Sequence, residues 1–291
     1  MPHQFGIQSP LEYIQMMRLC CALLESNFEI YFPVAAKPLL QYWSQYFPIQ
    51  YHLGLEQVPL LHDLEISHTE PFCRLGTLKR SLIFPHGMVQ WCRQEWQTDR
   101  PTQFLFCGLI TEKRKRCLEG WIQACFGRND VILPTQDVQY GKLKRLLTVL
   151  KKVRQGWHRS PSRYEIPELG LCISASQKGR QFPGKIWDDD YYRSLAQAQF
   201  VLCPDGDYTW TYRFFESILC GAIPIIENTC SSYDGFEFFS MQDPIDRLVY
   251  SPEMAERNFE KAVERLTLPM DELNAELTRL LQGDTNVATS L

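Results

Sequence analysis

The sequence has 291 residues, of which 45% are hydrophobic and 22% are charged, so it can bury a sizeable core and is typical of an ordinary globular protein. Its formal net charge of -4 gives no general electrostatic reason to bind nucleic acid or an anionic membrane surface, so any anion site must be local. Residues 1–30 lack a basic start followed by an apolar stretch, and no run of about 18 apolar residues occurs, which predicts a cytoplasmic protein without an integral membrane segment and leaves peripheral membrane association open.

The first hundred residues mix helical and strand patterns. Hydrophobic spacing predicts a helix over residues 11–24, a strand over residues 28–32 and another amphipathic stretch over residues 39–47. Prolines break the remaining apolar runs into short pieces, of which residues 81–84 are the best candidate for a strand. Residues 93–102 are predicted to link this part to the next.

From residue 103 onward, apolar strands alternate with helical segments. Strands are expected over residues 104–107, 131–133, 171–174, 200–203 and 222–226, and helices follow Thr111 and cover residues 142–153, 191–198 and 211–220. Such alternation predicts an α/β fold with a parallel, doubly wound sheet in the C-terminal half. After Pro252, two helices separated by Pro269 are expected, followed by a frayed tail over residues 283–291.

The eleven cysteines are an odd number and lie mostly in apolar runs, with no CxxC pair among them. This distribution predicts buried, reduced thiols rather than disulfides or a metal centre.

The pattern of residues 200–226 predicts a strand, a glycine-containing turn, a helix that ends at a glycine, and a second strand. Ligands of parallel sheets bind at the carboxyl ends of strands, where the turn with Gly206 and Asp207 would lie. The helix that follows begins near Thr209 to Thr211, and its free amides and positive dipole end suit a phosphate.

Arg213 falls in the first turn of that helix, where the dipole mildly disfavours a cation, and an arriving diphosphate would explain its presence. Glu216 lies three residues later on the same face. The alternative left open at this point is a surface ion pair between the two side chains.

Four motifs in this region resemble the signature of the exostosin family of glycosyltransferases in order and spacing. They are Tyr192-x-x-Leu195, Phe200-Val-Leu-Cys-Pro-Asp-Gly206, Arg213-x-x-Glu216 and Cys220-Gly-Ala-Ile-Pro-Ile-Ile226. The resemblance is clear over residues 188–228, extends more weakly back to residue 104, and covers about half of the chain.

The resemblance implies the fold called GT-B, with two Rossmann-like lobes: a reduced acceptor-side lobe over residues 1–100 and a nucleotide-sugar-binding lobe over residues 101–255, followed by C-terminal helices and a tail over residues 256–291. It implies transfer of a sugar from a nucleotide diphosphate sugar to a glycan or other small acceptor, with inversion, as in polysaccharide biosynthesis. By the same resemblance Arg213 would hold the diphosphate and Glu216 would accept hydrogen bonds from ribose or sugar hydroxyls.

Two basic segments are further candidates for the donor site. Arg114 and Arg116 follow the strand at residues 104–107 and, by the resemblance, would assist Arg213; the alternative is a solvated helix face. Lys178 and Arg180 lie in a basic loop after the strand at residues 171–174, and could close over the phosphates or be a mobile loop.

Acidic clusters could hold a metal, but in a GT-B enzyme arginines, lysines and helix ends usually neutralise the diphosphate. Asp205 and Asp207 are therefore interpreted as turn and capping residues, Asp188 as a helix start, and no cofactor or metal is expected. An inverting reaction needs a base, for which His86 and Asp63 are the candidates.

Three alternatives remain open. One is a fucosyltransferase-like GT-B enzyme that uses a guanine nucleotide sugar, and another is a non-catalytic nucleotide-sugar-binding protein that binds without turnover. The third is an unrelated α/β interaction protein in which Arg213 is structural.

Overall fold

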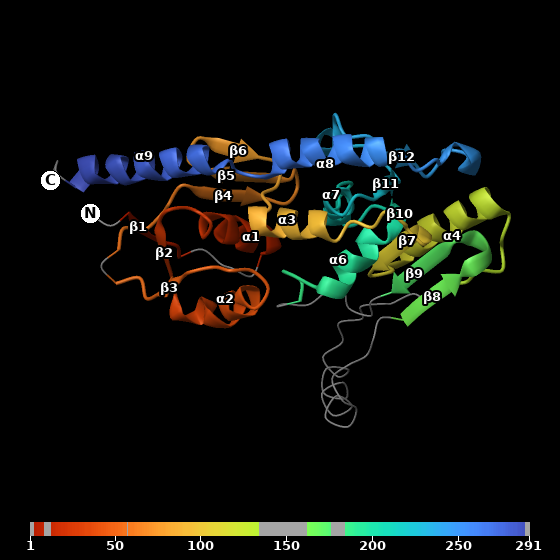
Figure 1. Ribbon diagram of the computed structural model, residues 1–291, viewed down its shortest axis with the longest axis horizontal. Coiled ribbons are helices and arrows are strands. Elements are labelled where there is room, and N and C mark those ends of the chain that lie inside the picture. Colours follow the sequence, from red (N-terminus) through yellow and green to blue (C-terminus); the bar gives the residue numbers. More distant parts are fainter. Residues whose placement is uncertain (1–2, 9–12, 57, 134–161, 176–183, 289–291) are drawn as a thin grey trace, which may run out of the picture.

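A computed structural model describes residues 3–8, 13–56, 58–133, 162–175 and 184–288 (Figure 1). Figure 1 shows an N-terminal sheet at one end of the long axis and a larger sheet at the other, with helices α8 (Pro252–Leu266) and α9 (Met270–Ala288) running along one side of both. No helix among the described residues is long and apolar enough to cross a membrane.

The N-terminal part forms a small parallel sheet of alternating strands and helices. Its strands are β1 (Gln4–Gly6), β2 (Glu29–Phe32) and β3 (His52–Leu53), in that order, and its helices are α1 (Ile14–Leu23) and α2 (Lys37–Ser44). Every residue of α1 is buried, including the polar Gln15 and Arg18 among its apolar side chains. Within the described residues, the helix predicted at residues 11–24 is present as α1, and the strand predicted at residues 28–32 is present as β2.

A second, antiparallel sheet follows, which the sequence did not reveal. It consists of β4 (Leu64–Ser67), β5 (Phe72–Leu75) and β6 (Leu78–Arg80), and is followed by helix α3 (His86–Gln94). The predicted strand at residues 81–84 is wrong. These residues connect β6 to α3, and Leu82, Ile83 and Phe84 are buried in the core without pairing in a sheet.

The larger sheet has six strands in the order β12-β11-β10-β7-β9-β8. Their bounds are β7 (Thr102–Gly108), β8 (Ser162–Ile166), β9 (Leu171–Ala175), β10 (Ala198–Cys203), β11 (Ile223–Ile226) and β12 (Phe239–Ser240). All neighbours are parallel except β8 and β9. The parallel-rich α/β sheet expected in the C-terminal half is thus confirmed.

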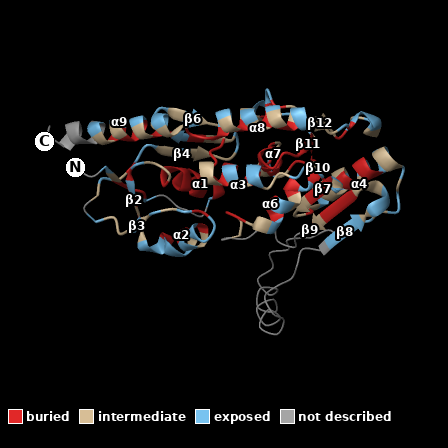
Figure 2. Ribbon diagram, viewed as in Figure 1, coloured by how far each residue is buried: buried red, intermediate tan, exposed pale blue. Residues whose placement is uncertain are grey.

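Both faces of this sheet are buried. Phe104 and Phe106 of β7 face a core with helix α4 (Glu112–Phe126), whereas Leu105 faces the core that contains α6 (Asp189–Ala196) and α7 (Tyr212–Leu219). Figure 2 shows the buried residues gathered in these central strands and helices. Burial on both faces explains why the strands read as nearly continuous apolar runs.

Most elements predicted after residue 103 are present, with three differences. Residues 131–133 do not form a strand, and Ile132 is exposed. The helix expected at residues 142–153 lies outside the described residues. Residues 283–288, expected to belong to a frayed tail, are instead the last part of α9, and residues 289–291 lie outside the described residues.

The core that contains α7 is continuous with that of the N-terminal part, so α1, the β4–β6 sheet, α8 and α9 all pack into it. The C-terminal helices are also joined to earlier segments by polar contacts: Thr77 N–H donates to Glu276 at 2.5 Å, and Phe84 N–H donates to the Leu266 carbonyl at 2.7 Å. All eleven cysteines are thiols; seven are buried and four are partly buried, in line with the prediction.

Candidate functional site at the carboxyl ends of β7 and β10

The order of strands places a switch in chain direction between β7 and β10. From β7 the chain passes to β9 on one side, and then returns to β10, β11 and β12 on the other. Helix α4, which follows β7, and helix α7, which follows β10, lie on opposite faces of the sheet. In open α/β sheets this is where a crevice forms and ligands bind.

Both helices begin in the same way at this edge. Thr111 caps α4 by accepting a hydrogen bond from the Arg114 amide at 3.3 Å, and Thr211 caps α7 by accepting one from the Phe214 amide at 3.3 Å. The predicted helix start at Thr111 is confirmed. Each cap leaves the positive end of a helix dipole at the carboxyl edge of the sheet, next to a guanidinium side chain.

Arg213 in the first turn of α7 reaches across to the end of β7. Its Nε donates to the Cys107 carbonyl at 2.9 Å, and its guanidinium carbon lies 4.4 Å from the centre of the Phe106 ring. The side chain is buried, and its Nη1 has no hydrogen-bond partner among the described residues. A buried guanidinium nitrogen without a partner is costly, so this site is prepared for an acceptor group.

Arg114 in the first turn of α4 points toward the same place from the other side. Its Nε donates to the Asp205 carbonyl at 3.1 Å and its Nη1 to the Leu109 carbonyl at 3.1 Å. Burial, and then repulsion by the Arg213 guanidinium, lower the pKa of Arg114 to about 10. Two cations that repel each other in a poorly solvated place would both be stabilised by an anion between them.

Two glycines allow the guanidinium groups to approach the backbone. A Cβ atom on Gly206 would lie 2.7 Å from Nη2 of Arg114, and a Cβ atom on Gly108 would overlap Nη2 of Arg213. Gly108 also has a φ of +152°, which a residue with a side chain rarely adopts. Gly206 was selected from sequence for close approach to a ligand; here it is a protein guanidinium that approaches it.

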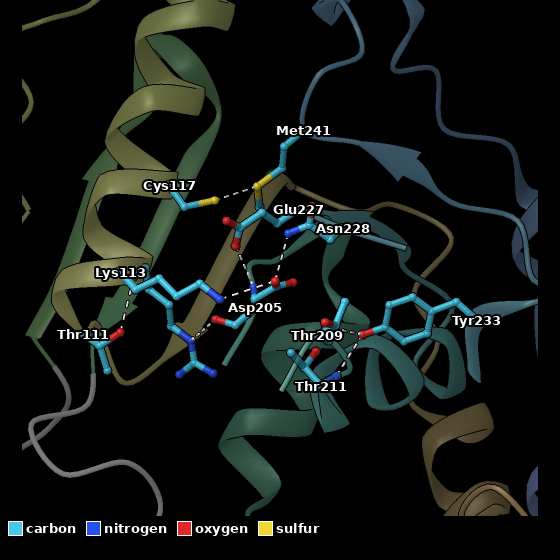
Figure 3. A network of polar contacts seen from close by, with 11 residues as sticks. Thr111, Lys113, Cys117, Asp205, Thr209, Thr211, Glu227, Asn228, Tyr233 and Met241 are labelled. Atoms are coloured by element: carbon cyan, nitrogen blue, oxygen red, sulfur yellow. Dashed lines mark hydrogen bonds and ion pairs between the residues drawn. The ribbon is translucent and has the colours of Figure 1, made fainter. Parts of the chain in front are cut away.

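Asp205 anchors the turn after β10 (Figure 3). Its amide donates to Glu227 at 3.0 Å, and its carboxylate accepts from Asn228 at 2.9 Å and lies 3.4 Å from the ammonium of Lys113. Glu227 and Asn228 directly follow β11, and sequence reasoning did not select them as site residues. The signal was available, because residues after β11 lie at the same carboxyl edge as those after β7 and β10.

The approach to α7 is held by Tyr233. The Thr211 amide donates to the Tyr233 hydroxyl at 2.8 Å, and that hydroxyl donates to the Thr209 carbonyl at 3.4 Å (Figure 3). Asp207 is exposed in the turn and its charge acts on Arg114. Gly206, Asp207, Thr209 and Thr211 are thus all part of the loop that leads from β10 to Arg213.

Glu216 occupies a different environment from the one expected. Its side chain is fully buried and forms an ion pair with Arg18 of α1 at 2.5 Å. Tyr191 donates to its second oxygen at 2.6 Å and Tyr192 to its first at 3.0 Å. The alternative of a surface pair between Arg213 and Glu216 is therefore wrong, since both side chains are buried and Glu216 has other partners.

The remaining basic and acidic candidates are distributed as follows. Arg116 is exposed, and its Nε donates only to the Glu112 carbonyl one turn earlier, at 3.4 Å. Lys178 and Arg180 lie outside the described residues. Asp188 caps α6 by accepting from the Tyr191 amide at 3.2 Å, as predicted. No group of three or more His, Cys, Asp or Glu within the described ranges is placed to hold a metal ion.

His86 and Asp63 do not meet in one place. His86 is the first residue of α3, with its Nε2 at 2.7 Å from the Leu268 carbonyl, and it lines a cavity of about 780 Å³ near the junction of α8 and α9. Asp63 is exposed before β4, and its carbonyl accepts from Gly76. Neither Arg114 nor Arg213 lines that cavity or a neighbouring one of about 350 Å³.

Replacing Gly108 by alanine is expected to disturb this site directly. The new methyl group would displace the Arg213 guanidinium, and the positive φ would add strain of about 1–3 kcal/mol. The control is Gly120→Ala in α4, where a methyl group meets open space and should stabilise by about 1 kcal/mol. Urea unfolding of both variants measures the effect; equal stability of the two would contradict the packing of Arg213 against Gly108.

Comparison with known proteins identifies the family of this chain. The model of the exostosin GT47 domain matches residues 79–246, which is more than half of the chain and includes β7, β10, α7 and both arginines. No curated protein matches the chain. Among solved structures, the crystal structure of a GtfA/B complex is similar at 13% identity and a TM-score of 0.33, over 88% of this chain and 46% of that chain, so the chain spans less than half of that protein's length. The family match shows that this chain belongs to the exostosin GT47 family of glycosyltransferases.

Proposed function

We propose that the chain is a GT-B-type enzyme that binds a nucleotide diphosphate sugar at the carboxyl ends of β7 and β10 and transfers the sugar, with inversion, to a glycan or other small acceptor. The observation that carries the proposal is the pair of inward-facing guanidinium groups, Arg114 and Arg213, at the strand switch. Each stands in the first turn of a helix whose positive end faces the same edge.

The proposed role of these groups is to hold the diphosphate as it leaves. Negative charge develops on the leaving diphosphate as the glycosidic bond breaks, and arginines placed in advance stabilise that charge in a site with little water. Because Arg213 Nη1 has no partner among the described residues, it can donate to a phosphate oxygen without breaking an existing hydrogen bond. Because the chain as a whole carries a net charge of -4, an anion would be attracted by these local cations and not by the overall charge of the protein.

Inversion requires a base that takes the proton of the acceptor hydroxyl. Of the two candidates, His86 lines a cavity and Asp63 lines neither of the two cavities described above, so His86 is the one proposed here. Its Nε2 must carry the proton, because it faces a carbonyl oxygen, which leaves Nδ1 as the basic atom. The boundaries of residues 1–100, 101–255 and 256–291 for the acceptor side, donor side and C-terminal helices are part of the same proposal.

Thermal unfolding with UDP, GDP, CDP, ADP and dTDP, each with and without a chelator, tests the donor site. One nucleotide at about 100 times its dissociation constant should stabilise the protein by about 2.7 kcal/mol, with no loss when the chelator is present. A response to GDP alone would favour the fucosyltransferase-like alternative. A response without turnover of any matching nucleotide sugar would favour a binding protein, and no response to any nucleotide would contradict the proposal.

A further inference from the structure

Two cavities adjoin each other on the side of the molecule formed by the β4–β6 sheet. The larger, of about 780 Å³, lies between β6 and the junction of α8 and α9, and the smaller, of about 350 Å³, lies between the β4–β5 turn and Ser231 and Ser232. Lys79 and Ser81 line both. Both volumes fall within the roughly 300–1,000 Å³ typical of ligand sites.

Both walls of the smaller cavity are bonded to the segment that leads into α7. On one wall, the carbonyl of His68, next to Ser67, accepts a hydrogen bond from the Trp210 indole at 2.9 Å. On the other, Ser232 is followed by Tyr233, whose hydroxyl accepts from the Thr211 amide at 2.8 Å. The smaller cavity therefore lies beside the N-terminal end of α7. Thr211, which caps this helix, is two residues before Arg213.

The lining is rich in hydroxyl groups. The side chains of Ser67, Ser81 and Ser231 make no hydrogen bond with another described residue, so their hydroxyl groups can turn toward a ligand. Pro71 and Phe72 supply apolar surface in the same cavity. Hydroxyl groups beside flat apolar surface suit a sugar ring, which presents hydroxyl groups at its rim and C–H groups on its faces.

The charges in this groove are nearly balanced. Lys79 and Glu70 both line the smaller cavity, and Arg80 is paired with Glu272 at 3.3 Å in the larger one. Arg265 donates to the Asp234 carbonyl, and Glu264 lies beside it in the chain. A balanced lining gives no net attraction for an acidic ligand.

We infer that these two cavities form one groove that binds an uncharged oligosaccharide as the acceptor, with one end of the glycan in the smaller cavity beside α7. The inference rests on the proposed function for its link to catalysis, but the binding of the glycan to the groove does not depend on the nucleotide. His86 lies in the larger cavity of the same groove, where the proposed base can reach a hydroxyl of the bound glycan.

Isothermal titration with cellopentaose, xylopentaose, maltopentaose and chitopentaose, and with pentagalacturonate as an acidic comparison, tests the groove in the absence of nucleotide. At least one uncharged pentasaccharide should bind the wild type. Ser231→Tyr, which fills the smaller cavity, should weaken this binding roughly tenfold or more. Thr229→Tyr, at an exposed position of the same loop outside either lining, should bind as the wild type does.

A second pair of variants tests the opposite wall: Ser67→Tyr, which fills the cavity, and Thr69→Tyr, at the exposed tip of the turn. Unchanged glycan binding in Ser231→Tyr, failure of every uncharged pentasaccharide to bind the wild type, or binding of pentagalacturonate alone would each overturn the inference. If the glycan binds and no nucleotide does, the groove stands and the donor-site proposal fails; if a nucleotide binds and no glycan does, the reverse holds.

Discussion

Arg213→Ala should weaken binding of the responding nucleotide diphosphate about 10- to 100-fold, because a hydrogen bond to a charged group contributes about 1.5–3 kcal/mol. Arg213 is the residue in which burial, an unpartnered Nη1 and the helix end coincide. Arg213→Lys keeps the charge but loses the fork that can hold two phosphate oxygens, so its affinity should fall between those of the wild type and the alanine variant.

The measurement must separate binding from stability, because Arg213 also holds the Cys107 carbonyl and packs on Phe106. Losing these contacts lowers the free energy of unfolding. Part of that loss is offset, because removing one cation relieves the repulsion that lowers the pKa of Arg114. Titration calorimetry well below the unfolding midpoint gives the dissociation constant of the folded protein. The matched control is Arg116→Ala, an exposed arginine of α4 that contacts only its own helix.

Equal weakening in Arg116→Ala and Arg213→Ala would contradict a defined site and indicate a general effect of charge. Unchanged affinity in Arg213→Ala would leave the arginine a purely structural role at the end of β7. Loss of affinity in Arg213→Ala alone, together with a similar loss in Arg114→Ala, would support a diphosphate bound between the two guanidinium groups.

The C-terminal half was predictable because its signals are local. Each strand that is buried on both faces is a short apolar run, and helices α4, α6 and α7 start at the capping side chains of Thr111, Asp188 and Thr211. The place of the site was predictable for a related reason: residues that follow parallel strands must meet at one edge. The match to residues 79–246 covers this same half.

The antiparallel β4–β6 sheet and the partners of Glu216 were not predictable, because they depend on distant segments. The apolar residues 81–84 resemble a strand in sequence, yet Phe84 is buried against the core by its contact with Leu266, far along the chain. Arg18 and Glu216 are 198 positions apart, and a lone arginine in an apolar helix gives no indication of its partner. The expectation that Glu216 would face ribose hydroxyls followed from its position in the motif Arg213-x-x-Glu216. This motif does not include Arg18, so it gave no indication of the ion pair.

The ion pair between Arg18 and Glu216 should be among the most important single contacts for stability. Arg18 also lies 4.4 Å from the centre of the Phe84 ring and donates to the Tyr192 hydroxyl at 2.9 Å. Replacing it by methionine keeps much of its volume but leaves the Glu216 carboxylate buried without its cation. Loss of one partner of such a pair costs about 3–5 kcal/mol, so Arg18→Met should unfold at a much lower urea concentration.

The double variant Arg18→Met/Glu216→Gln should recover part of this loss, because the neutral amide oxygen can still accept from Tyr191 or Tyr192 while no charge remains buried. The control is Arg74→Ala, which breaks the exposed pair with Glu65 and should cost no more than about 1 kcal/mol. If Arg18→Met and Arg74→Ala proved equally stable, the buried pair would not hold α1 against α7. If it does hold them, α1 fixes the helix that carries Arg213, and the N-terminal part is needed for the donor site to form.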